Sequence, residues 1–172
     1  MTDALKARIR HVPDFPKPGI LFYDVTTLLR DPEGFGIAID RLVAPFASSQ
    51  VDLVVGIESR GFILGSAVAD RLGAGFVPVR KLGKLPSKTI QATYALEYGT
   101  DCLEMHSDAI TKGQRVLIVD DLLATGGTAA ATVQLVKELG GEIAGVAFLI
   151  ELVGLDGRSR LEGEQVHTVL SY

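Results

Sequence analysis

One stretch near the middle of the chain constrains the fold more than any other. Residues 116–119 are Val-Leu-Ile-Val, and such an apolar, β-branched run is typical of a strand buried on both faces of a parallel sheet. The carboxylates Asp120 and Asp121 follow, and then the loop Ala-Thr-Gly-Gly-Thr at 124–128. Apolar residues at helical spacing continue to a glycine pair at 140–141, which is a typical helix stop. The stretch predicts a strand, an acidic pair, a glycine loop and a helix.

The loop has the chemistry of a phosphate site. Glycines let a backbone expose its N–H groups to a close ligand, and the first amides of a helix are unpaired at the positive end of its dipole. Two threonines add hydroxyl donors. We therefore expect a monophosphate to bind at Ala124, Thr125, Gly126, Gly127 and Thr128.

The acidic pair points to a sugar beside that phosphate. Carboxylates are poor phosphate ligands but good acceptors for hydroxyl groups, so Asp120 and Asp121 are predicted to hold a ribose. Such a ligand would lie beyond the carboxyl ends of the strands, where open parallel sheets usually bind ligands. Taken singly, the acids also fit a solvated strand end and the glycines a tight turn. No Gly-Lys-Ser/Thr follows the loop and no complete G-x-G-x-x-G occurs, which disfavours nucleoside triphosphates and dinucleotides.

Composition sets the outer limits. With 172 residues the chain is expected to form one domain, residues 1–172. A net charge of −4 argues against bulk binding to nucleic acid or to an anionic membrane. The single cysteine, Cys102, permits no intrachain disulfide and suits the reducing cytoplasm. The longest apolar run, residues 143–150, is too short to cross a bilayer.

Further strands and helices alternate along the chain. This pattern predicts an α/β fold with a mostly parallel sheet. Pro78 places its strand near a sheet edge. The predicted strands are 51–57, 75–79, 142–152 and 166–170, with a hairpin around 99–100, and the predicted helices start at 32 and 62.

Two basic segments adjoin these elements. Arg60 stands in the turn 58–61, where it could hold a diphosphate or simply be exposed. Arg80, Lys81 and Lys84 belong to a segment with glycine and proline and no periodicity up to residue 93, which indicates either a lid or a solvated loop.

The N-terminal region differs from the rest. Three prolines and a glycine at residues 11–19 argue against regular structure there, and a short strand or extended segment is expected at 20–25. Taken alone, a residue such as Phe22 is more often part of the core than stacked on a planar base, although such stacking is physically reasonable.

The segment 116–128 resembles the phosphoribosyl-diphosphate signature of the type I phosphoribosyltransferases. The likeness runs from about residue 10 to the C-terminus, and Phe15–Phe22 and the Leu-Glu-Tyr-Gly at 96–99 are most similar to members that act on adenine. The resemblance implies a type I phosphoribosyltransferase-like fold, in which helices flank a mostly parallel central sheet. It also implies an N-terminal hood over the base, from about residues 1–30, and a flexible basic lid loop.

The resemblance also implies the reaction. A 5-phosphoribosyl group would pass from phosphoribosyl diphosphate to adenine, giving AMP and diphosphate, as in purine salvage by a cytoplasmic homodimer. Mg²⁺ would be bound mainly through the substrate diphosphate, with no dedicated metal residues. Glu97 would be the catalytic acid/base, although taken alone it would be an ordinary strand residue. The diphosphate would be held by Arg60, Arg80, Lys81 and Lys84, and adenine by Leu21, Phe22 and Tyr23. Some family members carry Arg at position 23, so the resemblance assigns no role to the Tyr23 side chain.

Two alternatives stay open at this point. One is the same fold acting on another purine, against which the hood and the Leu-Glu-Tyr-Gly segment argue. The other is a module that senses phosphoribosyl diphosphate without turnover. Such a module would be expected to lack Glu97 or the basic lid, and often to carry a nucleic-acid-binding domain.

Overall fold

The computed structural model describes residues 4–95 and 99–172. The chain divides into two compact units, Met1–Arg41 and Leu42–Tyr172, and each is described here by itself. The expectation of one domain with a hood of about thirty residues stays a prediction.

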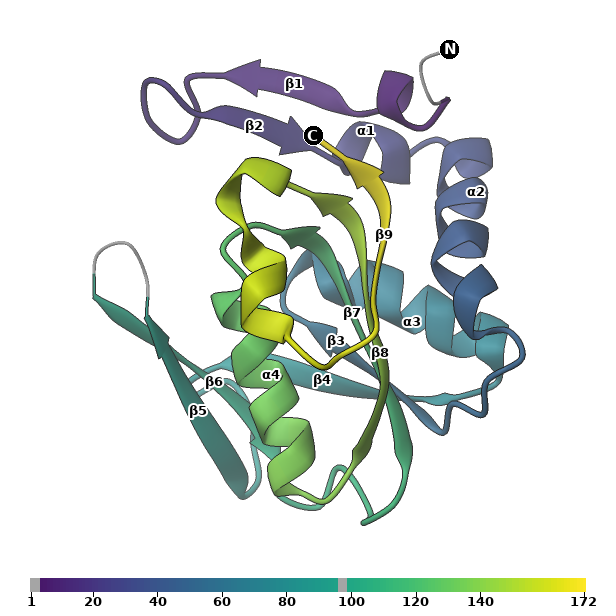
Figure 1. Ribbon diagram of the computed structural model, residues 1–172, viewed down its shortest axis with the longest axis vertical. Coiled ribbons are helices and arrows are strands. Elements are labelled where there is room, and N and C mark those ends of the chain that lie inside the picture. The colour runs from purple at the N-terminus through teal and green to yellow at the C-terminus, as the bar shows by residue number, and fades with distance from the viewer. Residues whose placement is uncertain (1–3, 96–98) are drawn as a thin grey trace. The chain divides into compact units, whose positions relative to one another are not determined.

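The second unit is built on a mostly parallel sheet (Figure 1). Its described strands run in the order β5-β6-β4-β3-β7-β8-β9. Neighbours from β4 to β9 pair in parallel, whereas β5 and β6 form an antiparallel hairpin that meets only the end of β4. The bounds are β3 Leu53–Ile57, β4 Gly75–Lys81, β5 Thr89–Ala95, β6 Thr100–His106, β7 Arg115–Leu123, β8 Glu142–Glu151 and β9 Val166–Ser171.

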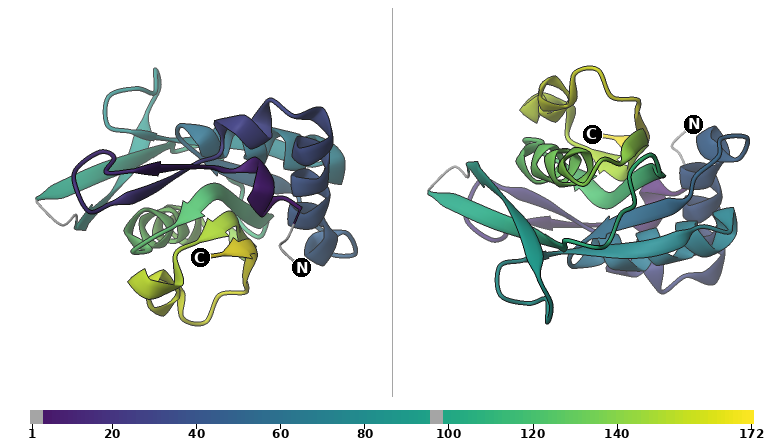
Figure 2. Two further views of the ribbon diagram at one scale, coloured as in Figure 1. Left: turned by 90° about the horizontal axis from the view of Figure 1, so that it is seen from above. Right: turned by 90° about the horizontal axis from the view of Figure 1, so that it is seen from below.

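Helices α3 (Arg60–Leu72) and α4 (Gly127–Glu138) cover opposite faces of this sheet (Figures 1 and 2). Helix α3 packs against β3, β4 and β7, and α4 against β5, β6, β7 and β8. Strand side chains alternate between the faces, so Val116 and Ile118 join the buried cluster that includes α4 residues. Short 3₁₀ turns complete the unit: Ala44–Phe46, Val153–Leu155 and Gly157–Leu161. The predicted α/β class with a mostly parallel, helix-flanked sheet is confirmed.

Several boundaries differ from the sequence-based expectation. Helix α3 begins at Arg60, so Arg60 lies in the first turn of a helix and not in a turn before a helix that starts at residue 62. Strand β7 continues through the acidic pair to Leu123, because β8 pairs with it as far as Glu151. The expectation of a structureless segment up to residue 93 was wrong at both ends, since β4 includes Arg80 and Lys81 and β5 begins at Thr89, pairing antiparallel with β6 along its length. Pro78 is tolerated because β6 pairs only with Arg80 and Lys81 of β4, which leaves the rest of that side of β4 without a β6 partner.

The N-terminal unit contains a small antiparallel ribbon. Strand β1 (Arg10–Pro13) pairs with β2 (Leu21–Asp24), so the expectation of irregular structure throughout 11–19 was wrong for its first residues. Pro13 fits because it ends a strand of a two-stranded ribbon, where its missing N–H costs little. The unit also holds the 3₁₀ turn Lys6–Arg8, α1 (Thr26–Leu29) and most of α2 (Pro32–Val43). In residues 4–95 and 99–172, no helix has the length and apolar character needed to cross a membrane.

Candidate active site

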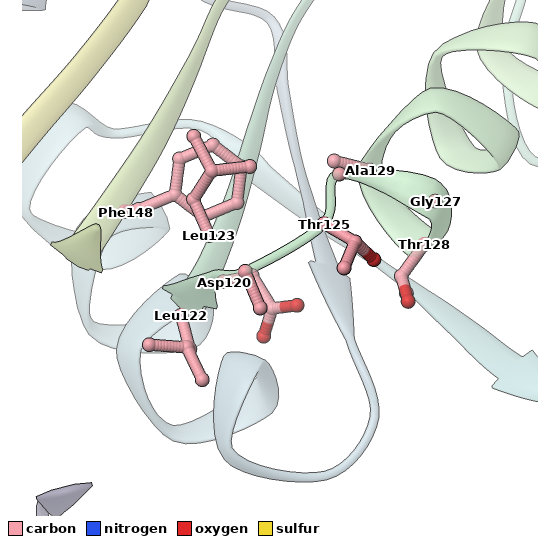
Figure 3. Close-up of a pocket in the computed structure, with 10 residues that line it drawn as sticks. Asp120, Leu122, Leu123, Thr125, Gly127, Thr128, Ala129 and Phe148 are labelled. Carbon is pink, nitrogen blue, oxygen red and sulfur yellow. The ribbon is translucent and has the colours of Figure 1, made fainter. Parts of the chain in front are cut away.

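The loop between β7 and α4 lines a small cavity of about 70 Å³. Its walls include Asp120, the segment 122–129 and Phe148. The hydroxyl groups of Thr125 and Thr128 and the carboxylate of Asp120 lie on the same side of this segment (Figure 3). The structure therefore brings Asp120 and the glycine loop to one cavity, whereas Asp121 is not among the residues that line it.

The shape of this loop depends on a close backbone contact. Gly126, the N-cap of α4, has a left-handed backbone with φ of 79°, which glycine adopts without steric cost. A Cβ on Gly126 would lie 2.3 Å from the carbonyl oxygen of Gly157, and a Cβ on Gly157 would lie 2.3 Å from that of Ala124. The turn Gly157–Leu161 thus packs backbone to backbone against the loop, and only glycine fits at either position.

The two carboxylates of the acidic pair have different surroundings. Asp121 accepts a hydrogen bond from Nε of Arg60 at 2.5 Å, and its backbone N–H donates to Oδ1 of Asp120 at 2.9 Å. Burial raises the pKa of Asp120 well above the usual range of an aspartate, and the charge of Asp121 raises it further. One member of the pair is therefore ion-paired, whereas its neighbour is held toward its neutral form.

The basic positions at the end of β4 and just beyond it are also paired with carboxylates. Glu58 accepts from Nε of Arg80 at 2.9 Å and from Nζ of Lys84 at 2.5 Å. Asp101 accepts from Nζ of Lys81 at 2.6 Å. The hydrogen bond from Lys81 is the main reason that the pKa of Asp101 lies below its ordinary value.

A third carboxylate anchors the loop that follows β4. Glu104 on β6 is only 3% exposed and accepts from the backbone amides of Lys84 and Leu85, both at 2.9 Å. Burial alone would raise the pKa of Glu104, but the amides of Leu85, Lys84 and Gly83 outweigh it and the pKa lies below its ordinary value. A charged, buried Glu104 therefore holds the start of this loop in place.

Tyr94 connects the basic segment with the glycine loop. Its hydroxyl donates to Asp101 at 3.1 Å, and the Thr128 hydroxyl hydrogen-bonds to the phenol group as well. A Cβ on Gly127 would lie 3.2 Å from the Tyr94 ring. Burial raises the pKa of Tyr94, so the phenol stays protonated and available as a donor at neutral pH.

The predicted base-binding residues lie on β2 in the N-terminal unit. Leu21 is 43% exposed, whereas Phe22 and Tyr23 are half-buried. Phe22 packs edge-on against Phe15 with ring centroids 5.1 Å apart, and Tyr23 packs in the same way against His11. The predicted acid/base Glu97 lies outside the described residues, between Ala95 of β5 and Thr100 of β6.

Sequence reasoning missed several residues that shape the site. Glu58, Asp101, Glu104 and Gly157 carry no motif, since each acts through a partner at least twenty residues away or through a backbone contact. Glu151, placed by the sequence at the end of its strand, forms a two-pronged ion pair with Arg158 at 2.7 and 2.8 Å.

Known proteins resemble the chain along nearly its full length. The family model described as "Phosphoribosyl transferase domain" matches residues 26–168. An adenine phosphoribosyltransferase of Koribacter versatilis is 60% identical over 170 residues, covering 99% of this chain and 93% of that protein.

Two solved structures share the fold. A crystal structure of adenine phosphoribosyltransferase from Rhodothermus marinus superposes with a TM-score of 0.94 at 60% identity, covering 98% of this chain and 96% of the other. The Saccharomyces cerevisiae enzyme, crystallised with an imino-altritol bisphosphate and adenine, has a TM-score of 0.92 at 45% identity and 96% coverage of both chains.

Proposed function

The chain belongs to the adenine phosphoribosyltransferases of the phosphoribosyl transferase family, and we propose that its site transfers the 5-phosphoribosyl group from phosphoribosyl diphosphate to adenine, releasing AMP and diphosphate. The observation that carries this proposal is the cavity in which Asp120 faces the hydroxyl groups of Thr125 and Thr128 at the start of α4. A phosphate with a ribose beside it matches both kinds of group.

The 5′-phosphate is proposed to bind in the loop Ala124–Thr128. The first amides of α4 have no intrahelical acceptor, Gly126 supplies no side-chain cap, and Gly126, Gly127 and Thr128 line the cavity. These amides, the helix dipole and the hydroxyl groups of Thr125 and Thr128 are the donors that a phosphate needs.

The rest of the substrate is proposed to lie between the acidic pair and the basic groups. Asp120 and Asp121 would accept hydrogen bonds from the ribose hydroxyls. The diphosphate would be held by the cationic side chains of Arg60, Arg80, Lys81 and Lys84. As the bond between C1′ and the diphosphate oxygen breaks, these cations stabilise the negative charge that develops on the leaving group.

Mg²⁺ is proposed to enter bound mainly to the diphosphate oxygens, where it offsets part of the leaving-group charge. The described carboxylates near the basic residues, Glu58, Asp101 and Asp121, already pair with cations of the chain. Mg²⁺ prefers phosphate oxygens and water to a cage of protein ligands. The chain's donor set therefore suits a metal that arrives with the substrate.

Adenine is proposed to stack on Phe22, with the backbone at Leu21 and Tyr23 reading its edge. A ring nitrogen of adenine forms the new bond to C1′, and its proton must leave. Glu97 is proposed as the acceptor of that proton. Positive charge is expected on the ribose ring in the transition state, as in glycoside cleavage, so placement of the base is expected to count more than its activation.

Glu97→Gln is expected to lower kcat about tenfold and to leave the KM for phosphoribosyl diphosphate nearly unchanged. The amide keeps the size of the side chain but removes the proton acceptor, and a ribosyl cation needs less help from a base than general-base reactions usually do. Steady-state kinetics with Glu162→Gln as an exposed control would measure both constants. Equal changes in kcat and KM would argue against the acid/base role.

Base-dependent release of diphosphate tests the function itself. The protein, Mg²⁺ and phosphoribosyl diphosphate would be mixed in turn with adenine, hypoxanthine, guanine, xanthine or orotate, and the product identified by chromatography. AMP from adenine alone is expected. Turnover of another purine would show that the N-terminal segment does not select adenine. Tight binding of phosphoribosyl diphosphate with no turnover would favour a sensing module.

We also propose a cytoplasmic homodimer. The resemblance to the family supports the dimer, and the single cysteine suits a reducing compartment. Sedimentation velocity should give twice the 18.3 kDa chain mass; a species of one chain mass at micromolar concentration would contradict the dimer.

A further inference from the structure

Glu58 stands at the centre of the basic groups. It follows β3 directly, its side chain is 9% exposed, and its backbone N–H donates to the carbonyl of Val79 on β4 at 3.0 Å. Oε2 accepts from Nε of Arg80 at 2.9 Å and from the amide of Lys81 at 3.2 Å, while Oε1 accepts from Nζ of Lys84 at 2.5 Å. Both carboxylate oxygens of Glu58 therefore accept hydrogen bonds from the segment that contains Arg80, Lys81 and Lys84.

The two cationic side chains are also oriented relative to each other. Nη1 of Arg80 donates to the carbonyl oxygen of Lys84 at 3.3 Å, and the guanidinium lies 5.9 Å from the centre of the Phe62 ring. Glu104 on β6 accepts a hydrogen bond from the backbone amide of Lys84. Each contact restricts the side chains that would otherwise be long and mobile.

The charge on Glu58 is what keeps these cations together. Burial alone would raise its pKa, but hydrogen bonds from Lys84, Arg80 and the amide of Lys81 outweigh burial, so the pKa lies below its ordinary value. An ionised carboxylate between Arg80 and Lys84 offsets the repulsion between two like charges.

The contacts with Glu58 leave further donors on both cations. Glu58 takes Nε of Arg80, whose remaining N–H groups lie on the two terminal nitrogens, and one of the three N–H donors of Lys84. An anionic ligand can therefore bind Arg80 and Lys84 while Glu58 still orients them.

Resting on the proposed function, we propose that Glu58 is a positioning residue of the diphosphate subsite and that it acts by holding the side chains of Arg80 and Lys84 in place. In the sequence Glu58 directly precedes Ser59-Arg60-Gly61. It contacts the cations and not the substrate. Its loss releases those cations, so the affinity for a ligand that carries the diphosphate falls, whereas the affinity for AMP, which lacks the diphosphate, does not.

The test is Glu58→Gln, in which the side chain keeps its shape and loses its charge. We expect the KM for phosphoribosyl diphosphate and the Kd for Mg²⁺-diphosphate to rise about tenfold, with the Kd for AMP within twofold of wild type. Glu164→Gln is the matched control, because Glu164 is 11% exposed and accepts from Nζ of Lys137 at 2.5 Å at the far end of α4. That variant should leave all three constants unchanged.

Other outcomes overturn the proposal. A lower KM in Glu58→Gln would mean that Glu58 competes with the diphosphate for the cations. A lower melting temperature with unchanged binding constants would leave it a purely structural anchor. If wild-type protein forms no AMP, the proposed function fails; if it does and the variant keeps wild-type affinity, only the role of Glu58 fails.

A double variant keeps the proposal testable if Glu58→Gln folds poorly. In Glu58→Gln with Lys84→Gln, a neutral amide pair replaces the ion pair. If Glu58 acts through Arg80 and Lys84, the loss of affinity that Glu58→Gln adds to the Lys84→Gln background is smaller than tenfold, because only Arg80 remains to be released. A further loss of tenfold or more relative to Lys84→Gln alone would contradict the proposal.

Discussion

Gly157→Ala is expected to lower kcat/KM for phosphoribosyl diphosphate about 100-fold, because a misplacement of about 1 Å at a binding site can cost that much. The added methyl group would lie 2.3 Å from the carbonyl oxygen of Ala124 and 2.9 Å from Cδ1 of Leu123. The first of these atoms is backbone of the predicted phosphate loop and cannot rotate away. The loop must therefore shift, although Gly157 lies far from it in the sequence.

The same substitution should also destabilise the fold. Overpacking of a buried position typically costs about 1–3 kcal/mol, and for a chain of this size each kcal/mol lowers the melting temperature by about 2–4 °C. Gly154→Ala in the same segment is the control, since nothing lies within 4 Å of a Cβ there. Kinetics and thermal denaturation of both variants check the prediction. Wild-type kcat/KM in Gly157→Ala would show that the contact with Ala124 does not shape the site.

Asp120→Asn is expected to stabilise the protein while weakening substrate binding. Asp120 is buried, and its raised pKa means that the folded state resists its ionisation. An amide in its place keeps the acceptor for the Asp121 N–H and removes the charge. Removing a buried carboxyl group whose ionisation the fold opposes is expected to add on the order of 1 kcal/mol to the free energy of unfolding, or about 2–4 °C to the melting temperature.

The pH dependence identifies the cause. The folded protein binds the Asp120 proton more tightly than the unfolded chain does, so ionisation costs stability as the pH rises from the unfolded pKa through the folded one. The stability gap between Asp120→Asn and wild type should open over that range and close in acid, below the unfolded pKa. Thermal denaturation from acidic to neutral pH measures it, and a gap that does not change with pH would contradict the assignment.

Binding should change in the opposite direction. Losing a carboxyl oxygen that accepts from a ribose hydroxyl costs about 0.5–1.5 kcal/mol, or roughly 2–10-fold in affinity, measurable by calorimetry with phosphoribosyl diphosphate and Mg²⁺. Asp121→Asn is the informative comparison, because it removes the negative charge that pairs with Arg60 and should lower stability as well as affinity. Unchanged affinity in the double variant of Asp120→Asn and Asp121→Asn would remove the ribose assignment.

Local patterns predicted much of the framework. The apolar run at 116–119, the glycine loop at 124–128 and the helical spacing after it anticipated β7 and α4 to within a few residues. Such signals are local, since burial on both faces, helix capping and turn formation depend on neighbours in the sequence. The resemblance read from the same segment placed the chain in the correct family.

Pairing between strands decided what these patterns could not. Residues 89–93 read as a structureless loop because their sequence has no clear alternation, yet β6 supplies a partner for every residue of β5. The acidic pair read as the end of a strand, yet β8 extends the pairing of β7 beyond it. In both places a hydrogen-bonding partner distant in sequence overrode local preference.

The sequence alone therefore determined the fold class, the glycine loop between β7 and α4 and the identity of the charged groups, because each depends on a short run of residues. Only the tertiary structure decided which carboxylate pairs with which basic side chain, and which backbone segment packs against the glycine loop. Glu58 meets Arg80 and Lys84 across more than twenty residues, and Gly157 meets Ala124 across more than thirty. Contacts of that range depend on how the strands are ordered in the sheet, and no local pattern encodes that order.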